Sequence, residues 1–409
     1  MIRPLRFCMI TTFYPPCNFG GDGLFVYRLS NALAARGHSV DVIHCIDSYR
    51  LLAHRTPELP CDSNSKVTVH KLKSPFGFLS PLATQQTGFP FLKTSRIRKI
   101  LEKGFDVIHY HNISLVGGPK ILEYGKGIKL YTIHDYWMVC PTHVMFQFNR
   151  IWCSHPKCFP CVLKYARPPQ LWRYFGIFKG AFRHVDAFIA PSCSCKQIHR
   201  RLGMDLPLIH LPHFVVSTNS ALLYSEEAIG YLPDGPFFLY AGRLEKLKGL
   251  QTLIPVFHRY SKARLLIAGT GSYEAFLRKS TNGMDNIRFL GHLSEQQLRI
   301  LYRQAVALLV PSLCIEIFAL VILEAFREKT PVIVRNLGGM PEIIRESGGG
   351  FVYDTEDELI AALDRLMDDP SYRNELGCRG YQAFKQKWTE EAHLTQYFKL
   401  INNIKMNRR

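Results

Sequence analysis

Two glutamates, Glu316 and Glu324, lie in the apolar stretch CIEIFALVILEAF, which runs from Cys314 to Phe326. A carboxylate accepts hydrogen bonds from paired hydroxyl groups, so two carboxylates in such surroundings are suited to holding two sugar rings. The preceding run VALLVPS is typical of a buried strand, and we expect a helix to begin at about Ala319 with its first amide groups unpaired. Those amides favour phosphate or sugar hydroxyls near Glu316. A charged helix flank is the alternative, but the neighbours of Glu324 are apolar.

Two cations follow another expected strand. The stretch GRLEKLKG, residues 242–249, comes directly after the apolar run FFLYA and carries Arg243 and Lys248. Ligands bind at the carboxyl ends of parallel strands, and Arg and Lys are good partners for phosphate oxygens. A solvated turn with surface charges is the alternative. The position at a strand end favours a diphosphate site.

The elements that position these residues form two series. The first opens with the strand-like run LRFCMITTF, a loop containing glycines, the helix-like segment LFVYRLSNALAARG and a second strand-like run, HSVDVIHCI. This order is one βαβ unit of a parallel sheet. Three more short runs have the character of buried parallel strands, at 105–111, 129–135 and 186–192. A second series of five apolar runs, separated by helix-like segments, lies between 237 and 336.

The sequence therefore predicts an α/β protein with two doubly wound, Rossmann-like domains whose strand ends face a central cleft. The expected division is an N-terminal domain at 1–215 and a C-terminal domain at 230–385, with the boundary within 213–236. Amphipathic helices at the end of the chain, 386–409, are expected to pack back towards the N-terminal domain.

Length, composition and charge agree with this division. The 409 residues are enough for two cores, and with 47% hydrophobic and 21% charged residues the chain is typical of a globular protein. We find no signal peptide and no apolar run long enough for a membrane span, so we expect a cytoplasmic protein. Residues 1–215 carry 27 Lys and Arg against 11 Asp and Glu, whereas the remainder carries 24 against 22. Such an excess is compatible with nucleic acid, anionic lipid or phosphorylated small molecules as partners.

Five motifs in order resemble one family. GRLEKLKG, LLIAGTGSYEAFL, NIRFLGHLSEQQLRILYRQA, VPSLCIEIFALVILEAF and TPVIVRNLGGMPEII resemble the donor-binding half of the family-four retaining glycosyltransferases of GT-B architecture. The N-terminal stretch FYPPCNFGGDGLFVYRLSNALAARGHSVDVI, the strand DVIHYHN and the pair His134–Asp135 resemble its acceptor half. The resemblance covers nearly the whole chain and implies transfer of a sugar, of the hexosyltransferase type, from a nucleotide-diphosphate sugar.

The resemblance also implies roles for single residues. Arg243 and Lys248 would neutralise the leaving diphosphate without a catalytic metal, and Glu324 would hold the ribose. Glu316 would bind hydroxyls of the donor sugar, and His134 would lie near that sugar and the acceptor. Further donor contacts would come from Gly21, Gly291, His292, Phe318 and Ala319.

Two departures from the family pattern concern selectivity. The family usually has glycine where this chain has Ala319 and a small residue or proline where it has Ile317, and it often has Asn where this chain has His213. A β-carbon at residue 319 would narrow the sugar pocket or require a slightly different backbone. We interpret this as altered selectivity rather than lost activity, because both cations and both glutamates are present.

Other functional classes are compatible with parts of the pattern. A catalytically weak protein that binds a nucleotide-sugar or an anionic polymer on the same scaffold is the main alternative, and release of nucleoside diphosphate would distinguish it from a transferase. We find no recognition helix, zinc finger or RNA-binding motif, so nucleic acid is not an expected partner.

An aromatic and basic segment suggests a membrane surface. In KYARPPQLWRYFGIFKGAFRH, residues 164–184, aromatic residues alternate with Arg and Lys, and from Pro169 the segment is compatible with one amphipathic helix. Such a helix lies on anionic bilayers, at the inner face of the membrane for a cytoplasmic protein, and would suit a lipid-linked acceptor or polysaccharide precursor. A core helix with basic edges is the alternative.

Four cysteines lie close together in an insert near 137–165. Cys140, Cys153, Cys158 and Cys161 have the spacing C-x12-C-x4-C-x2-C. Four thiolates can hold a structural zinc ion tetrahedrally, with no open position for catalysis. Two disulfides and four reduced thiols packed as small apolar groups are the alternatives.

Overall fold

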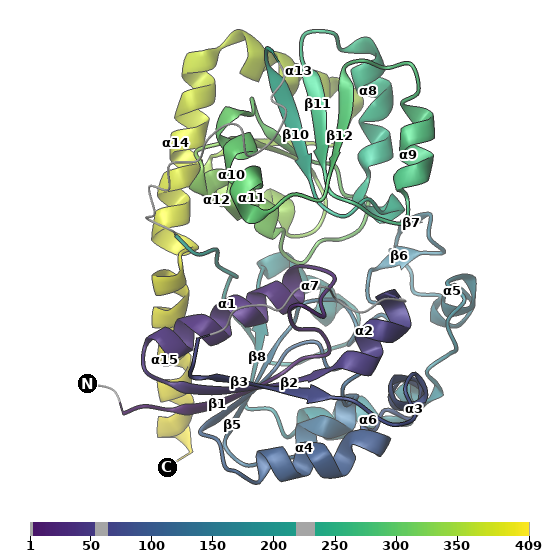
Figure 1. Cartoon of the computed structure of the whole chain (residues 1–409), viewed down its shortest axis with the longest axis vertical. Coiled ribbons are helices and arrows are strands. Elements are labelled where there is room, and N and C mark those ends of the chain that lie inside the picture. The colour runs from purple at the N-terminus through teal and green to yellow at the C-terminus, as the bar shows by residue number, and fades with distance from the viewer. Residues whose placement is uncertain (1–2, 54–63, 218–233, 409) are drawn as a thin grey trace.

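A computed structural model describes residues 3–53, 64–217 and 234–408 of the chain. Residues 218–233, which hold most of the expected domain boundary, lie outside the described residues. The described chain forms two α/β units stacked along the long axis of the molecule, and two helices at the C-terminal end run beside both units (Figure 1).

The first unit is built on a seven-stranded sheet in the order β3-β2-β1-β4-β5-β8-β9. All six strand pairs are parallel. The strands are β1 (Arg6–Ile10), β2 (Ser39–Cys45), β3 (Val67–Leu72), β4 (Val107–Tyr110), β5 (Ile128–Thr132), β8 (Ala187–Ala190) and β9 (Leu208–His210).

Helices connect these strands, and short 3-10 segments (η) lie among them. They are α1 (Gly21–Ala35), α2 (Ile46–Ala53), α3 (Leu79–Thr87), η1 (Phe91–Lys93), α4 (Thr94–Leu101), η2 (Pro119–Glu123), η3 (Leu171–Phe175), α6 (Ile177–Phe182) and α7 (Cys193–Arg201). The insert adds β6 (Phe146–Gln147), β7 (Ile151–Trp152) and α5 (Cys158–Lys164).

The second unit has a six-stranded parallel sheet in the order β12-β11-β10-β13-β14-β15. Its strands are β10 (Phe237–Ala241), β11 (Arg264–Ala268), β12 (Ile287–Gly291), β13 (Leu308–Val310), β14 (Val332–Arg335) and β15 (Gly350–Tyr353). Its helical segments are η5 (Lys246–Lys248), η6 (Leu250–Thr252), α8 (Ile254–Arg259), α9 (Glu274–Ser280), α10 (Glu295–Gln304), α11 (Leu320–Arg327), α12 (Met340–Ser347), α13 (Glu356–Asp368) and α14 (Pro370–Lys387).

The apolar runs become central strands because both faces of each sheet are covered. Every residue of β4 and of β10 is buried. One apolar cluster packs on each face of the first sheet and one on each face of the second. Burial on both faces is the arrangement in which a strand is apolar throughout its length.

The last helix, α15 (Glu390–Asn407), returns to the first unit. Its Tyr397 hydroxyl lies 2.9 Å from Nδ1 of His109 on β4, and its His393 donates to the carbonyl of Pro212 at 2.8 Å. At its far end, Arg408 pairs with the Asp186 carboxylate. These contacts fasten the C-terminal end of the chain to the N-terminal sheet.

The aromatic segment at 164–184 is not one amphipathic helix. Gly176, with φ 70°, adopts the left-handed conformation and separates η3 from α6. Trp172 and Phe182 are buried in the core, and the Arg173 guanidinium lies over the ring of Trp172. The segment is therefore partly a core element, and only Leu171, Tyr174 and Phe175 remain as exposed large apolar side chains. In the described part of the chain, no helix combines the length and apolar character that a bilayer span requires.

Candidate active site between the two domains

The carboxyl ends of the two sheets face each other, and the domains touch there. Ser192, which follows β8, donates to the carbonyl of Ile317 at 2.7 Å. The ring of His213 lies 5.4 Å from that of Phe318. The Glu342 carboxylate on α12 accepts the first amide groups of α7, at 2.8 and 3.0 Å, and so caps a helix of the other domain. The residues singled out by sequence gather around these contacts.

Glu316 forms an ion pair with Lys248 at the centre of this region. Lys248 Nζ lies 2.6 Å from Glu316 Oε1, and the Ser312 hydroxyl donates to the same oxygen at 2.8 Å. Burial alone would raise the pKa of Glu316, but the Lys248 ammonium and the Ser312 hydrogen bond lower it below its usual value. Burial opposes the charge on Lys248, yet Glu316 raises its pKa. Both groups are therefore charged at neutral pH.

Arg243 lies beside this pair and beneath the start of α1. Its side chain is 48% exposed, and Nη1 pairs with Glu245 at 2.6 Å. A β-carbon at Gly20 would come within 3.9 Å of its Nε, and one at Gly21 would come within 3.2 Å of Leu320. The contact at Gly20 would be an ordinary one, whereas a β-carbon at Gly21 would require Leu320 to shift, so α1 begins close against the second domain. The N-cap residue Gly20 offers no capping side chain, and the Asp22 carboxylate accepts a hydrogen bond from the Gly23 amide in the first turn.

Glu324 lies on α11, as expected, but it contacts a residue that the sequence did not indicate. Arg28 of α1, only 6% exposed, places Nη2 3.2 Å from Glu324 Oε1 and 3.7 Å from Glu295. The Tyr302 hydroxyl reaches the other Glu324 oxygen at 3.5 Å. The proposed ribose carboxylate is thus linked to the acceptor domain. No local pattern could have indicated Arg28, since its partner is 296 residues away.

Ala319, where the family usually has glycine, does not require an unusual backbone conformation. Ala319 precedes the first turn of α11 with φ −96° and ψ 99°, a conformation open to every residue. Its side chain is buried, as is that of Ile317. The β-carbon therefore occupies space at the site without straining the chain.

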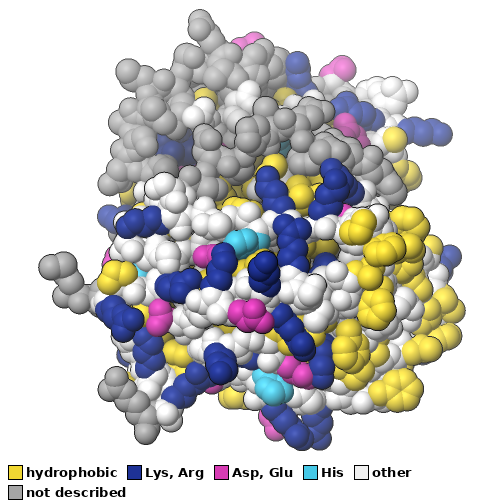
Figure 2. Space-filling view, turned by 60° about the horizontal axis from the view of Figure 1, so that its bottom comes forward, with side chains coloured by type: hydrophobic (Ala, Val, Ile, Leu, Met, Phe, Trp, Pro, Cys, Tyr) yellow, Lys and Arg dark blue, Asp and Glu magenta, His cyan; other side chains and the backbone are white. Residues whose placement is uncertain are grey.

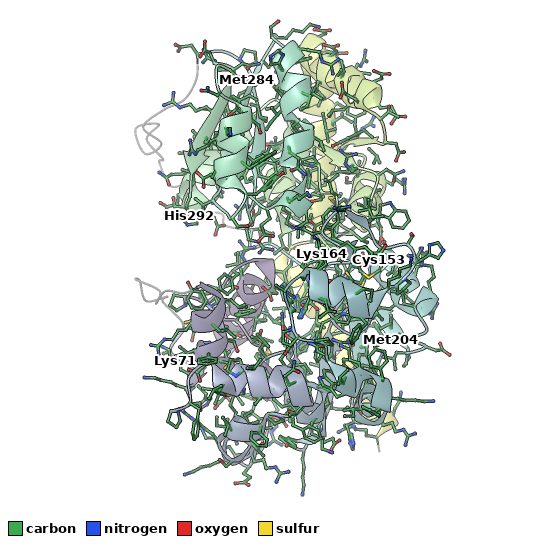
Figure 3. The ribbon with its side chains drawn as sticks, turned by 90° about the vertical axis from the view of Figure 1, so that its right-hand side faces the viewer. Lys71, Cys153, Lys164, Met204, Met284 and His292 are labelled. Carbon is green, nitrogen blue, oxygen red and sulfur yellow. The ribbon has the colours of Figure 1, made fainter. Side chains whose placement is uncertain are left out.

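Gly291 and His292 lie at the end of β12. Gly291 has φ 72°, and its carbonyl accepts from the Gly269 amide at 2.7 Å. A β-carbon at Gly269 would come within 1.9 Å of the Gly242 carbonyl oxygen. The ends of β10, β11 and β12 therefore pack closely through backbone. His292 is exposed, on the edge of the second domain that faces the first (Figure 3).

His134 is half-buried and lies against two buried histidines. Its Nε2 lies 2.9 Å from Nδ1 of His111, and its ring stacks on that of His213 at 4.8 Å. Burial lowers the pKa of His134 to about 4, although Asp135 favours the charged ring. The imidazole is therefore neutral at pH 7 and keeps one acceptor nitrogen.

Polar residues not singled out by the sequence surround His134. Asn112 donates to the carboxylates of Asp22 and Asp135, at 3.3 and 3.2 Å. His143 contacts the same Asp135 oxygen at 2.9 Å. Burial raises the pKa of Asp22, and the nearby Asp135 adds to this effect. The signal for Asn112 was its position directly after an expected strand, where ligands bind, and that for Asp22 was its position at the start of the helix after the glycine loop.

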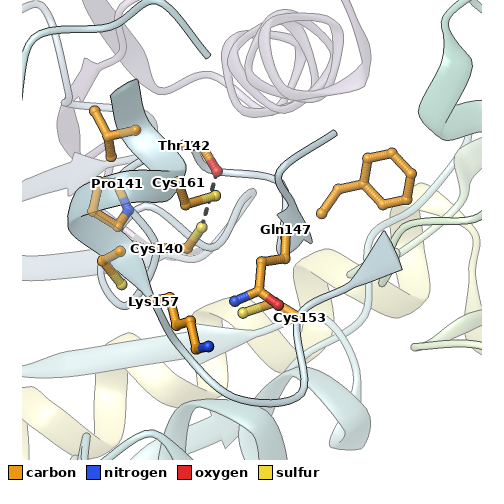
Figure 4. Close-up of a pocket in the computed structure, with 10 residues that line it drawn as sticks. Cys140, Pro141, Thr142, Gln147, Cys153, Lys157 and Cys161 are labelled. Carbon is orange, nitrogen blue, oxygen red and sulfur yellow. Dashed lines mark hydrogen bonds between the residues drawn. The ribbon is translucent and has the colours of Figure 1, made fainter. Parts of the chain in front are cut away.

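The four cysteines of the insert line one cavity away from these groups (Figure 4). Burial, and after it the charges of the other three thiolates, raise the pKa of Cys153 to about 11. The four thiols therefore lie near one another.

Comparison with known proteins agrees with this geometry. Residues 19–218 match the family described as Glycosyltransferase Family 4, and residues 226–383 match Glycosyl transferases group 1. The chain is 34% identical over 387 residues to an uncharacterised glycosyltransferase of Methanocaldococcus jannaschii, and the match covers 90% of each protein.

Solved structures share the fold. Sucrose-phosphate synthase from Thermosynechococcus elongatus superposes with a TM-score of 0.76 at 21% identity, covering 98% of this chain and 100% of that one. Anabaena HepE in complex with UDP gives a TM-score of 0.66 at 16% identity, covering 98% and 100%.

The solved structures show that the two-domain architecture is the GT-B fold, and the two family models together span most of the chain. This chain belongs to the family of group 1 and family 4 glycosyltransferases, which confirms the expected fold class and the expected enzyme class.

Proposed function

We propose that this protein transfers a sugar from a nucleoside-diphosphate sugar to an acceptor with retention of anomeric configuration. The observation that carries the proposal is the charged Lys248–Glu316 pair beside Arg243, at the carboxyl ends of β10 and β13. A cation for the leaving phosphate and a carboxylate for the sugar hydroxyls are thus held 2.6 Å apart.

The charge that develops on the leaving diphosphate meets three groups. Arg243 and Lys248 supply full positive charges, and the first turn of α1 at Gly21 supplies amide groups and the positive end of a helix dipole. Fixed positive charge of this kind lowers the barrier most when it faces charge that forms in the transition state. In this proposal these groups take the place of a catalytic metal.

The rest of the donor lies along the second domain. Glu324 accepts from the ribose hydroxyls, while Gly291 and His292 flank the base. Glu316 and the amides of Phe318 and Ala319 hold the transferred sugar, and the buried β-carbon of Ala319 limits the sugars that fit. The structure of Anabaena HepE in complex with UDP supports a nucleotide-sugar donor, since that protein shares the fold.

The acceptor approaches from the first domain. Neutral His134 contacts His111 through Nε2 and stacks on His213, and its other ring nitrogen, Nδ1, is suited to a hydroxyl group. Asp22 and Asp135 lie on the same edge of the first sheet, held by Asn112. A hydroxyl nucleophile bound there faces the donor sugar across the domain interface.

We infer further that the acceptor is lipid-linked and that the first domain binds an anionic bilayer at the cytoplasmic face. Figure 2 shows hydrophobic side chains gathered on one side of the molecule and Lys and Arg side chains over the adjoining part. The exposed fractions of Phe78, Phe91 and Phe175 are 58%, 62% and 78%. The apolar face defined by these residues also includes Phe76, Leu79, Phe89, Leu171 and Tyr174.

The two stretches that form the apolar face lie side by side. The Trp172 indole donates to the carbonyl of Gln85 at 2.8 Å, and the Gln85 amide donates to the carbonyl of Pro168 at 3.1 Å. Exposed basic residues flank both stretches, among them Lys73, Arg96, Lys99, Lys179 and Arg183. Exposed rings rimmed by cations fit the boundary between acyl chains and anionic headgroups.

The transferase proposal is tested with a thermal-shift screen of UDP, GDP and ADP, followed by incubation of the stabilising nucleotide's sugars with candidate acceptors. A ligand at 100 times its Kd stabilises the native state by about 2.7 kcal/mol. We expect one diphosphate to raise the melting temperature of the wild type but not of Lys248→Ala. No shift with any diphosphate and no release of nucleoside diphosphate from any donor would contradict the proposal, as would a product of inverted configuration.

The bilayer proposal is tested by sedimentation with vesicles. We expect binding to vesicles rich in anionic lipid, weaker binding at high salt, and loss of binding when Phe78, Phe91 and Phe175 are all replaced by Ser. Phe276→Ser is the matched control, since Phe276 is 51% exposed on the other domain. Equal binding of the triple variant and the control would refute the membrane role of this face.

A further inference from the structure

The four cysteines of the insert come from three neighbouring segments and meet at one small cavity. Cys140 lies in the turn after β5, Cys153 follows β7, and Cys158 and Cys161 lie on the first turn of α5. All four line a cavity of about 20 Å³ (Figure 4). That volume holds about one water molecule or one ion.

The insert has little regular structure to hold it in place. Between β5 and η3 it contains two strands of two residues each and one helix of seven. Of the seven non-glycine residues with positive φ in the described chain, five lie here, namely His143, Met145, Phe148, Asn149 and Ala166. Left-handed backbone costs about 1 kcal/mol or more for such residues and persists only where the surroundings fix it. A cross-link at the cavity would supply that constraint.

Donors are already directed at the sulfurs. The Phe148 amide donates to Cys161 Sγ at 3.3 Å, and the Thr142 hydroxyl lies 3.2 Å from Cys140 Sγ. Hydrogen bonds to ligand atoms of this kind orient thiolates around a metal and stabilise their charge. Two disulfides would need neither of these two hydrogen bonds.

The four sulfurs line one cavity, but they do not yet lie at the spacing of metal ligands. Among the described residues, the three potential ligand atoms within 4.8 Å of one another belong to Cys193, His210 and Glu342, and both Glu342 oxygens there already cap α7. Four sulfurs around zinc lie about 3.8 Å apart. Rotation about one Cα–Cβ bond moves a sulfur by about 3 Å, so metal binding here requires cysteine side chains to rotate towards the cavity.

We propose that Cys140, Cys153, Cys158 and Cys161 bind one structural Zn²⁺ that fixes the insert beside the acceptor edge of the first domain. The insert is close to that edge in the chain, because Asp135 lies five residues before Cys140. The Asp135 carboxylate also accepts a hydrogen bond from His143 of the insert. Four protein ligands leave no open coordination position, so the ion organises the loop and takes no part in the transfer.

The test combines metal content with spectroscopy on the full chain purified without chelator. We expect about one zinc per chain. Replacement of zinc by Co²⁺ should give the intense thiolate-to-cobalt absorption bands of a tetrahedral four-sulfur site, a readout that packed thiols would not produce. The double variant Cys158→Ser, Cys161→Ser should hold less than a tenth of the metal and melt at a lower temperature. Cys378→Ser, an exposed cysteine outside the cavity, should behave as wild type.

Three outcomes would overturn the site. Metal-free wild type in which all twelve thiols react after unfolding, without added reductant, would show reduced, packed cysteines. Metal-free protein with four fewer reactive thiols before than after reduction would show two disulfides. Cobalt bound without sulfur bands would place the metal elsewhere. Each result is obtained on the wild type, so the test stands even if the double variant fails to fold.

Discussion

Acidification should destabilise the protein through His393, which joins α15 to the first domain. The side chain is 3% exposed, packs against the rings of Phe25 and Phe214 at 5.5 and 4.9 Å, and donates to the Pro212 carbonyl. Burial lowers its pKa to about 4 from the ordinary 6.5, although the Pro212 carbonyl favours the charged ring. The neighbouring histidines 109, 111, 134 and 213 also have lowered pKa values.

The direction and the size of this loss of stability follow from the pKa of His393 in the folded chain, about 4, and in the unfolded chain, about 6.5. Because the folded pKa lies below the unfolded one, the stabilisation is complete above pH 6.5 and is lost as the pH falls from 6.5 towards 4. Between pH 7 and pH 5 the unfolded ring takes up a proton and the folded ring does not, which costs about 1.8 kcal/mol for this one residue. That is a large fraction of a typical folding free energy.

The assay is urea unfolding at pH 7 and pH 5 for the wild type and for His393→Asn, which keeps a donor near the Pro212 carbonyl but does not titrate. We expect the variant to lose about 1.8 kcal/mol less than the wild type between the two pH values. His258→Asn, at an exposed site on α8, is the matched control and should lose as much as the wild type. The same loss in all three proteins would refute the reasoning, because it would mean that His393 titrates alike in the folded and unfolded chains.

The remaining predictions concern the domain interface. Arg243→Ala or Lys248→Ala should lower the transfer rate by about 100-fold or more, and near-normal kinetics in both would remove the assigned diphosphate contacts. Glu324→Gln should mainly raise the KM for the donor, whereas Glu316→Gln should mainly lower kcat, because a contact at the reacting sugar can strengthen in the transition state. Identical changes of KM and kcat in the two variants would contradict these separate roles. Arg28→Ala should lower the free energy of unfolding by about 2 kcal/mol, since a buried, charged hydrogen bond to Glu324 is lost. Glu295 also pairs with Arg28 but is 54% exposed, so Glu295→Gln should change the free energy of unfolding little. Equal losses of stability in the two variants would show that the Arg28–Glu324 bond contributes no more than the exposed Arg28–Glu295 pair.

The sequence by itself determined which segments form the central strands and helices. Runs such as FDVIHYH and FFLYAGR are apolar throughout because they are buried on both faces. Two edge strands, β3 and β15, escaped the same reasoning, although the edge strand β12 was predicted. β3, VTVHKL, is mostly half-exposed or exposed, and β15 is four residues long and begins with glycine. Their local pattern does not distinguish them from loops, and the neighbouring strand supplies the pairing that makes them strands.

Only the tertiary structure decided how the functional side chains are paired. The sequence placed Glu316 at the start of a helix and Lys248 after a strand, but their ion pair spans 68 positions and that of Glu324 with Arg28 spans 296. The aromatic segment likewise has buried and exposed parts. Gly176 turns the chain between its two short helices, and Trp172 and Phe182 are buried in the core. Periodicity records which face of an element is buried, whereas the partner across an interface depends on how whole domains pack, and short stretches of sequence carry no record of that.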